Sequence, residues 1–465
     1  MTTRKTIGVL PLARSTFDVP LSEDYLERML GVLESSGHAI VGPRKLLMDQ
    51  DATREAIAEL KQTALSQILV LQISFTDAVA IVEIANAFDE PLSIWAVPEA
   101  RTGGKLRLNS FCGLNLAAYA LGLNGREFGY LYADQQSPGI GDAVSELLAG
   151  KRRAVAVPAR PANAGDPAGR EAARSLRGAR IGRLGAHPDG FDTCRYDKTA
   201  LKTLADITVD ELAITDLFDS ARSEGADMPA RLREQVAATL SGLDKVDQKQ
   251  LDRSLRLKGA LDQIRAAGTY DAFAVRCWPE TFTEYGGAVC GPVAMMGEAK
   301  VPCACEADVY GALTSLLLQK VAGAPAFLTD LVDLDVTDNT GVVWHCGQAP
   351  LSMADPDTKP TAAIHNNRRM PLLYEFPLKP GKVTFFRLSQ AKGMPMAVIG
   401  GGEMLKRPLA FNGTSGVVRF DSGSRNVLEH IMGAALEHHM ALAYGDHRAA
   451  LEAAAAELGL PVLIL

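Results

Sequence analysis

Short apolar runs alternate with amphipathic helical segments over the first 150 residues, and this alternation limits the possible folds more than any other feature. Strands joined by helices usually lie parallel in one sheet, because each right-handed crossover returns the chain to the end where the previous strand began. No GxGxxG motif follows the first strand, so a dinucleotide site is not indicated. The expected strands are Thr6–Leu12, 38–41, 67–73 and 92–97, and the expected helices are 22–33 (capped by Ser22), 52–63 and 77–88.

A second α/β unit and a strand-rich unit follow. The stretch 155–178 is rich in Ala, Arg, Pro and Gly and is the expected linker. After about residue 325, short strands separated by glycine-containing turns predict a β domain. The predicted fold is therefore α/β, with two Rossmann-like domains built on parallel sheets (1–160 and 161–325). A β-rich, barrel-like domain with terminal helices (326–465) completes it.

The composition is that of a soluble globular chain long enough for several domains. Of its 465 residues, 47% are hydrophobic and 22% are charged. The net charge of −7 argues against a protein that binds the phosphate backbone of nucleic acids. The apolar runs are too short for a membrane span, and the N-terminal run is too short for a signal peptide. Seven cysteines, an odd number at irregular spacings, favour reduced thiols in the cytoplasm.

Three carboxylates stand just past the carboxyl ends of predicted strands, where open α/β sheets bind ligands. Glu280 follows the apolar run 272–275. Glu306 and Asp308 follow the run 301–305, directly before a helical pattern. Oxygen ligands that converge in this way suit Mg²⁺ or Mn²⁺. The alternative interpretation is that Glu306 and Asp308 only cap the helix, since acidic side chains favour its first turn.

Half of the eight histidines lie close to the C-terminus. His438 and His439 are neighbours there, and adjacent side chains of a strand point to opposite faces, so at most one of them is expected in a given site. Turns at the ends of expected strands offer further ligand contacts, among them Arg14, Trp95 and His187. Ordinary loop roles are the alternative for each of these three residues.

The chain resembles the L-fucose/L-arabinose isomerase family over most of its length. The motifs that carry the resemblance occur in the family's order: Glu280 after its strand, CEADVYGALTSLLLQ around Asp308, VVWHCG at His345, and LEHHMALAYGDHRAALEAAAAELGLPVLIL at the end. Family members hold one divalent metal, typically Mn²⁺, with a Glu, an Asp or Glu, and a late His. The resemblance therefore implies Glu280, Asp308 and His439 as metal ligands, with Glu306 as an alternative to Asp308.

The resemblance also implies an activity, the interconversion of an aldose and a ketose through an enediol. The metal is expected to polarise the two sugar oxygens, while Glu280 and Asp308 transfer protons, in roles that the sequence leaves open. A homo-oligomer, trimer or hexamer, is expected, with sites near the subunit contacts. The implied sugar-binding residues are Arg14, Trp95, His187 and His345.

Other interpretations stay open. The same fold could isomerise a sugar that carries a sulfonate, such as sulfoquinovose, and Arg or Lys side chains should then gather near the pocket. A non-catalytic sugar-binding protein is a different class, suggested by the likeness of the first two domains to periplasmic binding proteins. Such a protein would bind sugar without metal, and the arrangement of acidic residues and a late His would then be unexplained. An aldolase or a hydrolase using the same metal is a further alternative.

Overall fold

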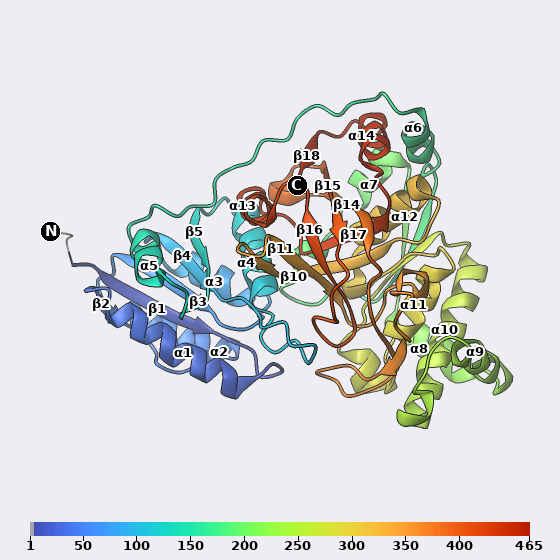
Figure 1. The fold of residues 1–465 in the computed structure, drawn as a ribbon, viewed down its shortest axis with the longest axis horizontal. Coiled ribbons are helices and arrows are strands. Elements are labelled where there is room, and N and C mark those ends of the chain that lie inside the picture. Colours follow the sequence, from blue (N-terminus) through green and yellow to red (C-terminus); the bar gives the residue numbers. More distant parts are fainter. Residues whose placement is uncertain (1–3) are drawn as a thin grey trace.

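The computed structural model describes residues 4–465 and contains three sheets: two parallel sheets with helices, and one large mixed sheet (Figure 1). The fold class predicted from the sequence is confirmed. None of the helices in the described part of the chain is long and apolar enough to cross a membrane.

The first sheet has the strand order β2-β1-β3-β4-β5, and all its pairs are parallel. The order reverses between β1 and β3, which is the point where open sheets of this kind bind ligands. The strands are β1 (Thr6–Leu12), β2 (Ala39–Val41), β3 (Gln67–Gln72), β4 (Leu92–Ala96) and β5 (Phe128–Tyr132), and the helices are α1 (Val19–Glu34), α2 (Gln50–Leu60), α3 (Val79–Ala87), α4 (Ser110–Leu123) and α5 (Ile140–Leu148).

The first helix begins earlier than the sequence predicted. Asp18, not Ser22, is the N-cap of α1, and its carboxylate accepts a hydrogen bond from the backbone N–H of Leu21. Pro20 fits this first turn because its missing N–H is not needed there. The hydroxyl of Ser22 donates instead to the carbonyl of Asp18, inside the helix.

The chain then crosses the molecule to the second unit as a long segment without regular structure (Figure 1). On the way, Arg160 pairs with Val462 of β18 (Val462–Ile464). The predicted linker, 155–178, is only partly irregular, because Asp166 caps a helix, α6 (Pro167–Arg174). This helix packs closely on α14 (Arg448–Glu457), because a Cβ at Gly169 would lie 1.8 Å from the carbonyl oxygen of Ala450.

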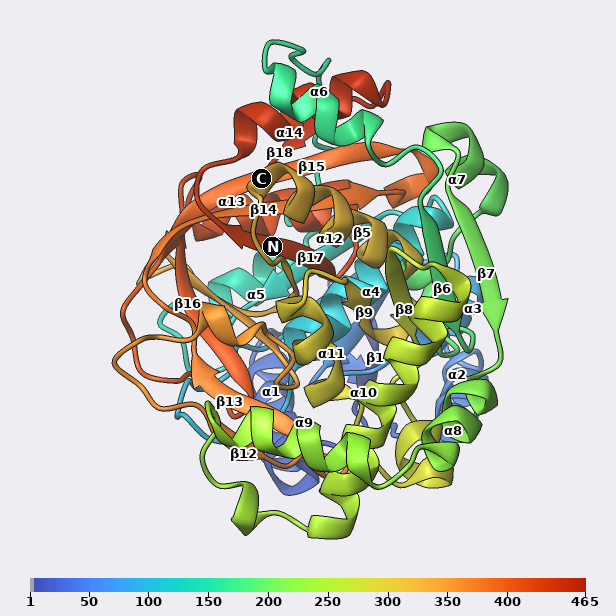
Figure 2. The same ribbon diagram turned by 90° about the vertical axis from the view of Figure 1, so that its right-hand side faces the viewer.

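The second sheet has the order β7-β6-β8-β9 and is also fully parallel. Its order reverses between β6 and β8, so this sheet too has a ligand-binding edge. Figure 2 shows helices α8 to α11 on the outside of this unit. The strands are β6 (Arg180–Leu184), β7 (Thr208–Leu212), β8 (Ala272–Val275) and β9 (Cys303–Ala304), and the helices are α7 (Lys198–Ala205), α8 (Ile214–Ser223), α9 (Asp227–Ala237), α10 (Gln248–Gly268), α11 (Cys290–Glu298) and α12 (Val309–Ala322).

The third sheet closes on itself. The strands β16, β11, β10, β17, β14 and β15 pair in that order, and β15 pairs again with β16, which makes a barrel. Three short strands extend it, and two of the pairings, β13–β16 and β15–β18, are parallel. The elements are β10 (Phe327–Asp335), β11 (Thr340–His345), β12 (Thr361–Ala363), β13 (Leu373–Pro377), β14 (Gly381–Ser389), β15 (Met396–Met404), β16 (Thr414–Phe420), β17 (His439–Tyr444), β18 (Val462–Ile464), α13 (Ser424–Ala434) and α14 (Arg448–Glu457).

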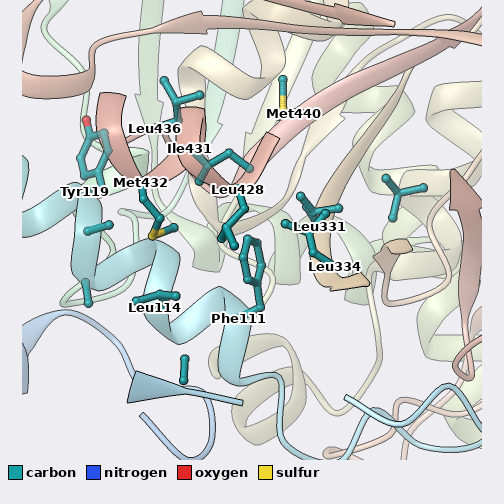
Figure 3. Packing of buried hydrophobic residues seen from close by; sticks show 14 of the residues in the cluster. Phe111, Leu114, Tyr119, Leu331, Leu334, Leu428, Ile431, Met432, Leu436 and Met440 are labelled. Atoms are coloured by element: carbon teal, nitrogen blue, oxygen red, sulfur yellow. The ribbon is translucent and has the colours of Figure 1, made fainter. Parts of the chain in front are cut away.

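The barrel and the first unit share one hydrophobic core. Side chains of α4, among them Phe111 and Leu114, pack with Leu331 of β10 and with Leu428 and Met432 of α13 (Figure 3). Helix α4 is buried on nearly every side, which explains its apolar sequence. This shared core fixes the loops of the first sheet relative to the barrel.

Candidate functional site

A cavity of about 130 Å³ lies where the three sheets meet. Arg14 and Phe75 reach it from the loops after β1 and β3, at the reversal of the first sheet. Trp278 reaches it from the loop after β8, and the barrel closes the far side. The arginine, carboxylate and histidine side chains at its wall are Arg14, Glu306, Asp330, His345, His365, Arg368 and His438.

His439 lies at the inner end of this site. It is the first residue of β17 and stands opposite Asp330 of β10 in the antiparallel ladder. Its Nδ1 lies 2.9 Å from Asp308 Oδ2, and Nδ1 must be the donor because a carboxylate can only accept. In the neutral ring, Nε2 then carries the lone pair. It lies 3.4 Å from Asp330 Oδ1 and 3.8 Å from Glu306 Oε2.

Glu306 is held in a strained turn. It lies in the short helix Cys305–Ala307 after β9 and has a φ of 57°, in the left-handed region that non-glycine residues avoid. Trp278 Nε1 donates to its Oε1 at 3.1 Å, and His438 Nε2 lies 3.0 Å from its Oε2. Burial alone would raise the pKa of Glu306, but the hydrogen bond from His438 and the charges of both histidines lower it. Glu306 is thus a carboxylate aimed at the cavity.

Asp330 is a buried carboxylate with little support from the protein. Over residues 4–465, its Oδ1 receives no hydrogen bond. Burial raises the pKa of Asp330 to about 7. The nearby His439 lowers this pKa, and the charge of Glu306 raises it. Asp330 and Glu306 each bring one oxygen close to Nε2 of His439, at 3.4 and 3.8 Å, and a cation near these three groups would offset the unfavourable burial of the two carboxylates. The donor set therefore fits a divalent metal ion.

Asp308 stands one layer behind the cavity. Its Oδ1 accepts from the N–H of Gly311 and so caps α12, as the capping interpretation predicted. Arg387 binds both oxygens, at 2.6 and 3.1 Å, and His439 binds Oδ2. Burial opposes ionisation, but the Arg387 and His439 interactions hold the pKa of Asp308 well below its usual range. Asp308 orients His439 in the way that carboxylates orient metal-binding histidines.

Besides Asp308, three of the residues expected in the site lie away from it, namely Glu280, His187 and Trp95. Glu280 pairs with Arg276 at 2.6 Å, and Arg276 in turn binds the carbonyl of His187. Glu280 and His187 are partly exposed on the loops of the second unit. Trp95 is a residue of strand β4 and is fully buried within the first unit, where its Nε1 donates to the carbonyl of Ala133. Arg14 and His345, in contrast, line the cavity.

Asp330 is not predicted from the sequence, and His438 is predicted only as an alternative to His439. The available signal for Asp330 was an aspartate in a buried strand, but Asp333 of the same strand gives the same signal. The expectation that at most one of His438 and His439 joins a site is wrong, because both rings approach Glu306. His438 precedes the first residue of β17, so the alternation of a regular strand does not apply to it.

Positive charge gathers at one wall of the cavity. The guanidinium groups of Arg14 and Arg368 lie over the same ring, that of Trp278, with their Cζ atoms 5.3 and 5.9 Å from its centre. Burial and the nearby charge of Arg14 lower the pKa of Arg368. Two guanidinium groups that repel each other in this way form a ready site for an anionic group of a ligand.

Comparison with known proteins gives a consistent result. A model of the fucose/sulfoquinovose isomerase N-terminal domain matches residues 8–151, and one of the L-fucose isomerase C-terminal domain matches residues 343–465. The sulfoquinovose isomerase of Clostridium sp. (strain MSTE9) is 30% identical over 445 residues, 95% of this chain and 94% of that protein. The sulfoquinovose isomerases of Priestia megaterium and Alkalicoccus urumqiensis are each 27% identical, with 95% of both chains covered.

Proposed function

This chain belongs to the fucose/sulfoquinovose isomerase family and is an aldose–ketose isomerase, and we propose that its substrate is an aldose with a sulfonate group, of the sulfoquinovose type. The activity predicted from the sequence is thereby confirmed, and the binding-protein interpretation is set aside. The sulfonated substrate was one of the alternatives that the sequence left open.

The observation that carries the choice of substrate is the pair of arginines over Trp278. A sulfonate is a singly charged group with three acceptor oxygens, and two guanidinium groups can together offer it several donors. Arg14 also approaches Asp77, at 3.8 Å, whereas Arg368 forms no ion pair within residues 4–465, so a neutral sugar would leave the Arg368 charge without a partner. The three relatives compared above bear the name sulfoquinovose isomerase, which supports the same choice.

We place the divalent cation between Glu306, Asp330 and His439. This set replaces the one implied by the resemblance, since Glu280 is engaged with Arg276 and Asp308 with Arg387. It keeps His439 and takes up Glu306, the alternative that the sequence had offered. Manganese as the cation, a trimeric or hexameric assembly and a cytoplasmic location stay predictions.

The cation, when bound, supplies charge that polarises the sugar carbonyl and acidifies the neighbouring hydroxyl. Asp330, which lines the cavity and whose Oδ1 receives no hydrogen bond from residues 4–465, removes the proton from the carbon beside the carbonyl and returns it to the adjacent carbon. Glu306, positioned by Trp278 and His438, moves the hydroxyl proton from one sugar oxygen to the other. The two transfers together convert the aldose into the ketose through an enediol.

His345 is suited to hold a sugar oxygen. Its Nδ1 accepts from the N–H of Cys346 at 2.8 Å and from the amide of Gln348, so the ring proton is on Nε2. Burial keeps the pKa of this histidine well below its usual value, and the ring is neutral. Over the described residues, Nε2 is buried and without a partner. A sugar hydroxyl in the cavity would complete its hydrogen bonding.

Substitution of either arginine should affect sulfonated sugars selectively. In Arg14→Ala and in Arg368→Ala, KM for sulfoquinovose should rise about 10- to 100-fold, because a hydrogen bond to a charged group contributes about 1.5–3 kcal/mol. NMR can follow ketose formation from sulfoquinovose, glucose and fucose. Arg174→Ala, on the exposed surface of α6, is the matched control and should change nothing. Equal losses for sulfonated and neutral sugars would exclude sulfonate recognition by these arginines.

Metal affinity should depend on pH. Because Asp330 must lose its proton to bind a cation, the affinity for Mn²⁺ should rise as the pH approaches about 7 and level off above it. Below that value the proton competes, and one proton per site corresponds to about a tenfold weaker affinity for each pH unit. Electron paramagnetic resonance of free Mn²⁺ measures this in metal-free protein. An affinity that stays constant from mildly acidic to neutral pH would contradict it.

A further inference from the structure

A second group of metal-binding side chains overlaps the site described above. Ligand atoms of Cys194, Glu306, His438 and His439 all lie within 4.8 Å of one another. Two of these residues, Glu306 and His439, belong to the proposed catalytic cation site, and the other two do not. Cys194 comes from the short helix Asp192–Cys194 that follows β6, so a third segment of the chain contributes to this group.

Three of the four side chains of this group are buried, and Glu306 is partly exposed to the cavity. Cys194 is completely buried, and its N–H donates to the carbonyl of Phe191 at 2.9 Å. The Phe191 ring packs edge-on against both Trp278 and His438. His438 is 4% exposed, and over the described chain its Nδ1 is buried and without a hydrogen-bond partner. A buried imidazole nitrogen without a partner is unfavourable unless something binds it.

The chemistry of the four ligands differs from that of the catalytic set. One thiol, two imidazoles and one carboxylate are the ligands from which proteins build tetrahedral zinc sites. Mn²⁺ and Mg²⁺ prefer oxygen ligands, and divalent zinc binds nitrogen and sulfur ligands more tightly than manganese does. Because Glu306 and His439 belong to both sets of ligands, only one of the two sets can bind an ion at a time.

We propose that Cys194, Glu306, His438 and His439 form an alternative binding position for Zn²⁺ and similar thiophilic ions, which excludes the catalytic cation. On binding, the S–H bond of Cys194 breaks, its proton goes to solvent, and the thiolate forms a bond to the ion. Zinc is therefore an inhibitor that competes with the catalytic cation. Inhibition rests on the proposed function, whereas binding of zinc through Cys194 does not.

Co²⁺ tests the binding position without any activity measurement, because a cobalt–thiolate bond gives a charge-transfer band in the near ultraviolet. Metal-free protein titrated with Co²⁺ should develop this band. Cys194→Ala and Cys194→Ser should lack it, and their zinc affinity should fall at least about tenfold, as measured by competition with a chromophoric chelator. The serine variant keeps the volume of the buried side chain, and circular dichroism checks its folding. Cys303→Ser, a buried cysteine outside the cavity, is the control and should keep the band.

Three outcomes would overturn the proposal: no band in the unmodified protein, an unchanged band in both Cys194 variants, or unchanged zinc affinity in them. The activity arm is separate. Zinc should inhibit the Mn²⁺-loaded enzyme, and Cys194→Ser should need at least about ten times more zinc for the same inhibition. A cobalt band that depends on Cys194 in a protein without isomerase activity would sustain this site and refute the proposed function.

Discussion

Asp330→Asn is expected to lower kcat for isomerisation by about 10²- to 10⁴-fold, the usual contribution of a positioned acid–base group. Asparagine has nearly the same shape, but it cannot take up the substrate proton, and it weakens the hold on the cation. The assay is ketose formation at saturating Mn²⁺, so that the chemical step and the metal affinity are measured apart. The affinity for Mn²⁺ should also fall, about 10-fold or more.

Asp333→Asn is the matched control for this substitution. Asp333 lies on the same strand, but it binds Arg101 and Tyr132 at the contact between the barrel and the first unit. Its substitution should lower thermal stability and leave kcat of the folded protein unchanged. If Asp330→Asn keeps more than a tenth of the unmodified kcat while Mn²⁺ is saturating, Asp330 is not the proton-transfer group.

Arg387→Met is expected to destabilise the fold by about 3–5 kcal/mol, the range for removal of one partner from a buried ion pair. Arg387 and Asp308 are each at most 2% exposed, so bulk solvent does not reach the carboxylate that the substitution leaves unpaired. The Asp308 carboxylate would then keep only the Gly311 N–H and His439 as partners. The free energy of unfolding from urea titration gives the size of the loss.

Arg448→Met is the comparison for that experiment. Arg448 also pairs with carboxylates, those of Asp421 and Asp446, but its side chain is 38% exposed. Exposed pairs contribute about 0–1 kcal/mol, so this variant should be nearly as stable as the unmodified protein. Similar losses in the two variants would show that the Arg387–Asp308 pair is no stronger than a surface pair.

Much of the architecture could be predicted from the sequence, because the signals for it are local. The β1 bounds, Thr6–Leu12, agree with the expected strand, and the change to closely spaced strands after residue 325 identified the barrel. The exception at 155–178 has a local cause as well. A short helix there is stabilised by the Asp166 cap and by the fit of Gly169 against α14. Neither contact can be recognised from the amino-acid composition of the segment.

The candidate site was harder to predict because its geometry depends on contacts between distant segments. The sequence offered Glu306 and Asp308 as alternatives, and spacing alone could not decide between them. The left-handed backbone of Glu306 sends its carboxylate toward Trp278, while Asp308 caps α12. Asp330 enters the site only because β10 pairs with β17, which sets it opposite His439. That pairing is a tertiary feature without a local signal.

The closed barrel has a consequence for how such an enzyme can change its substrate. Asp330 and His439 are held by the register of two strands in a ring without free edges, so their separation is hard to alter. Arg14 and Arg368 lie in loops from different parts of the fold, which tolerate exchange more readily. Isomerases for neutral or differently charged sugars should therefore be obtainable by grafting the two loops around Arg14 and Arg368, with the proton-transfer machinery left intact.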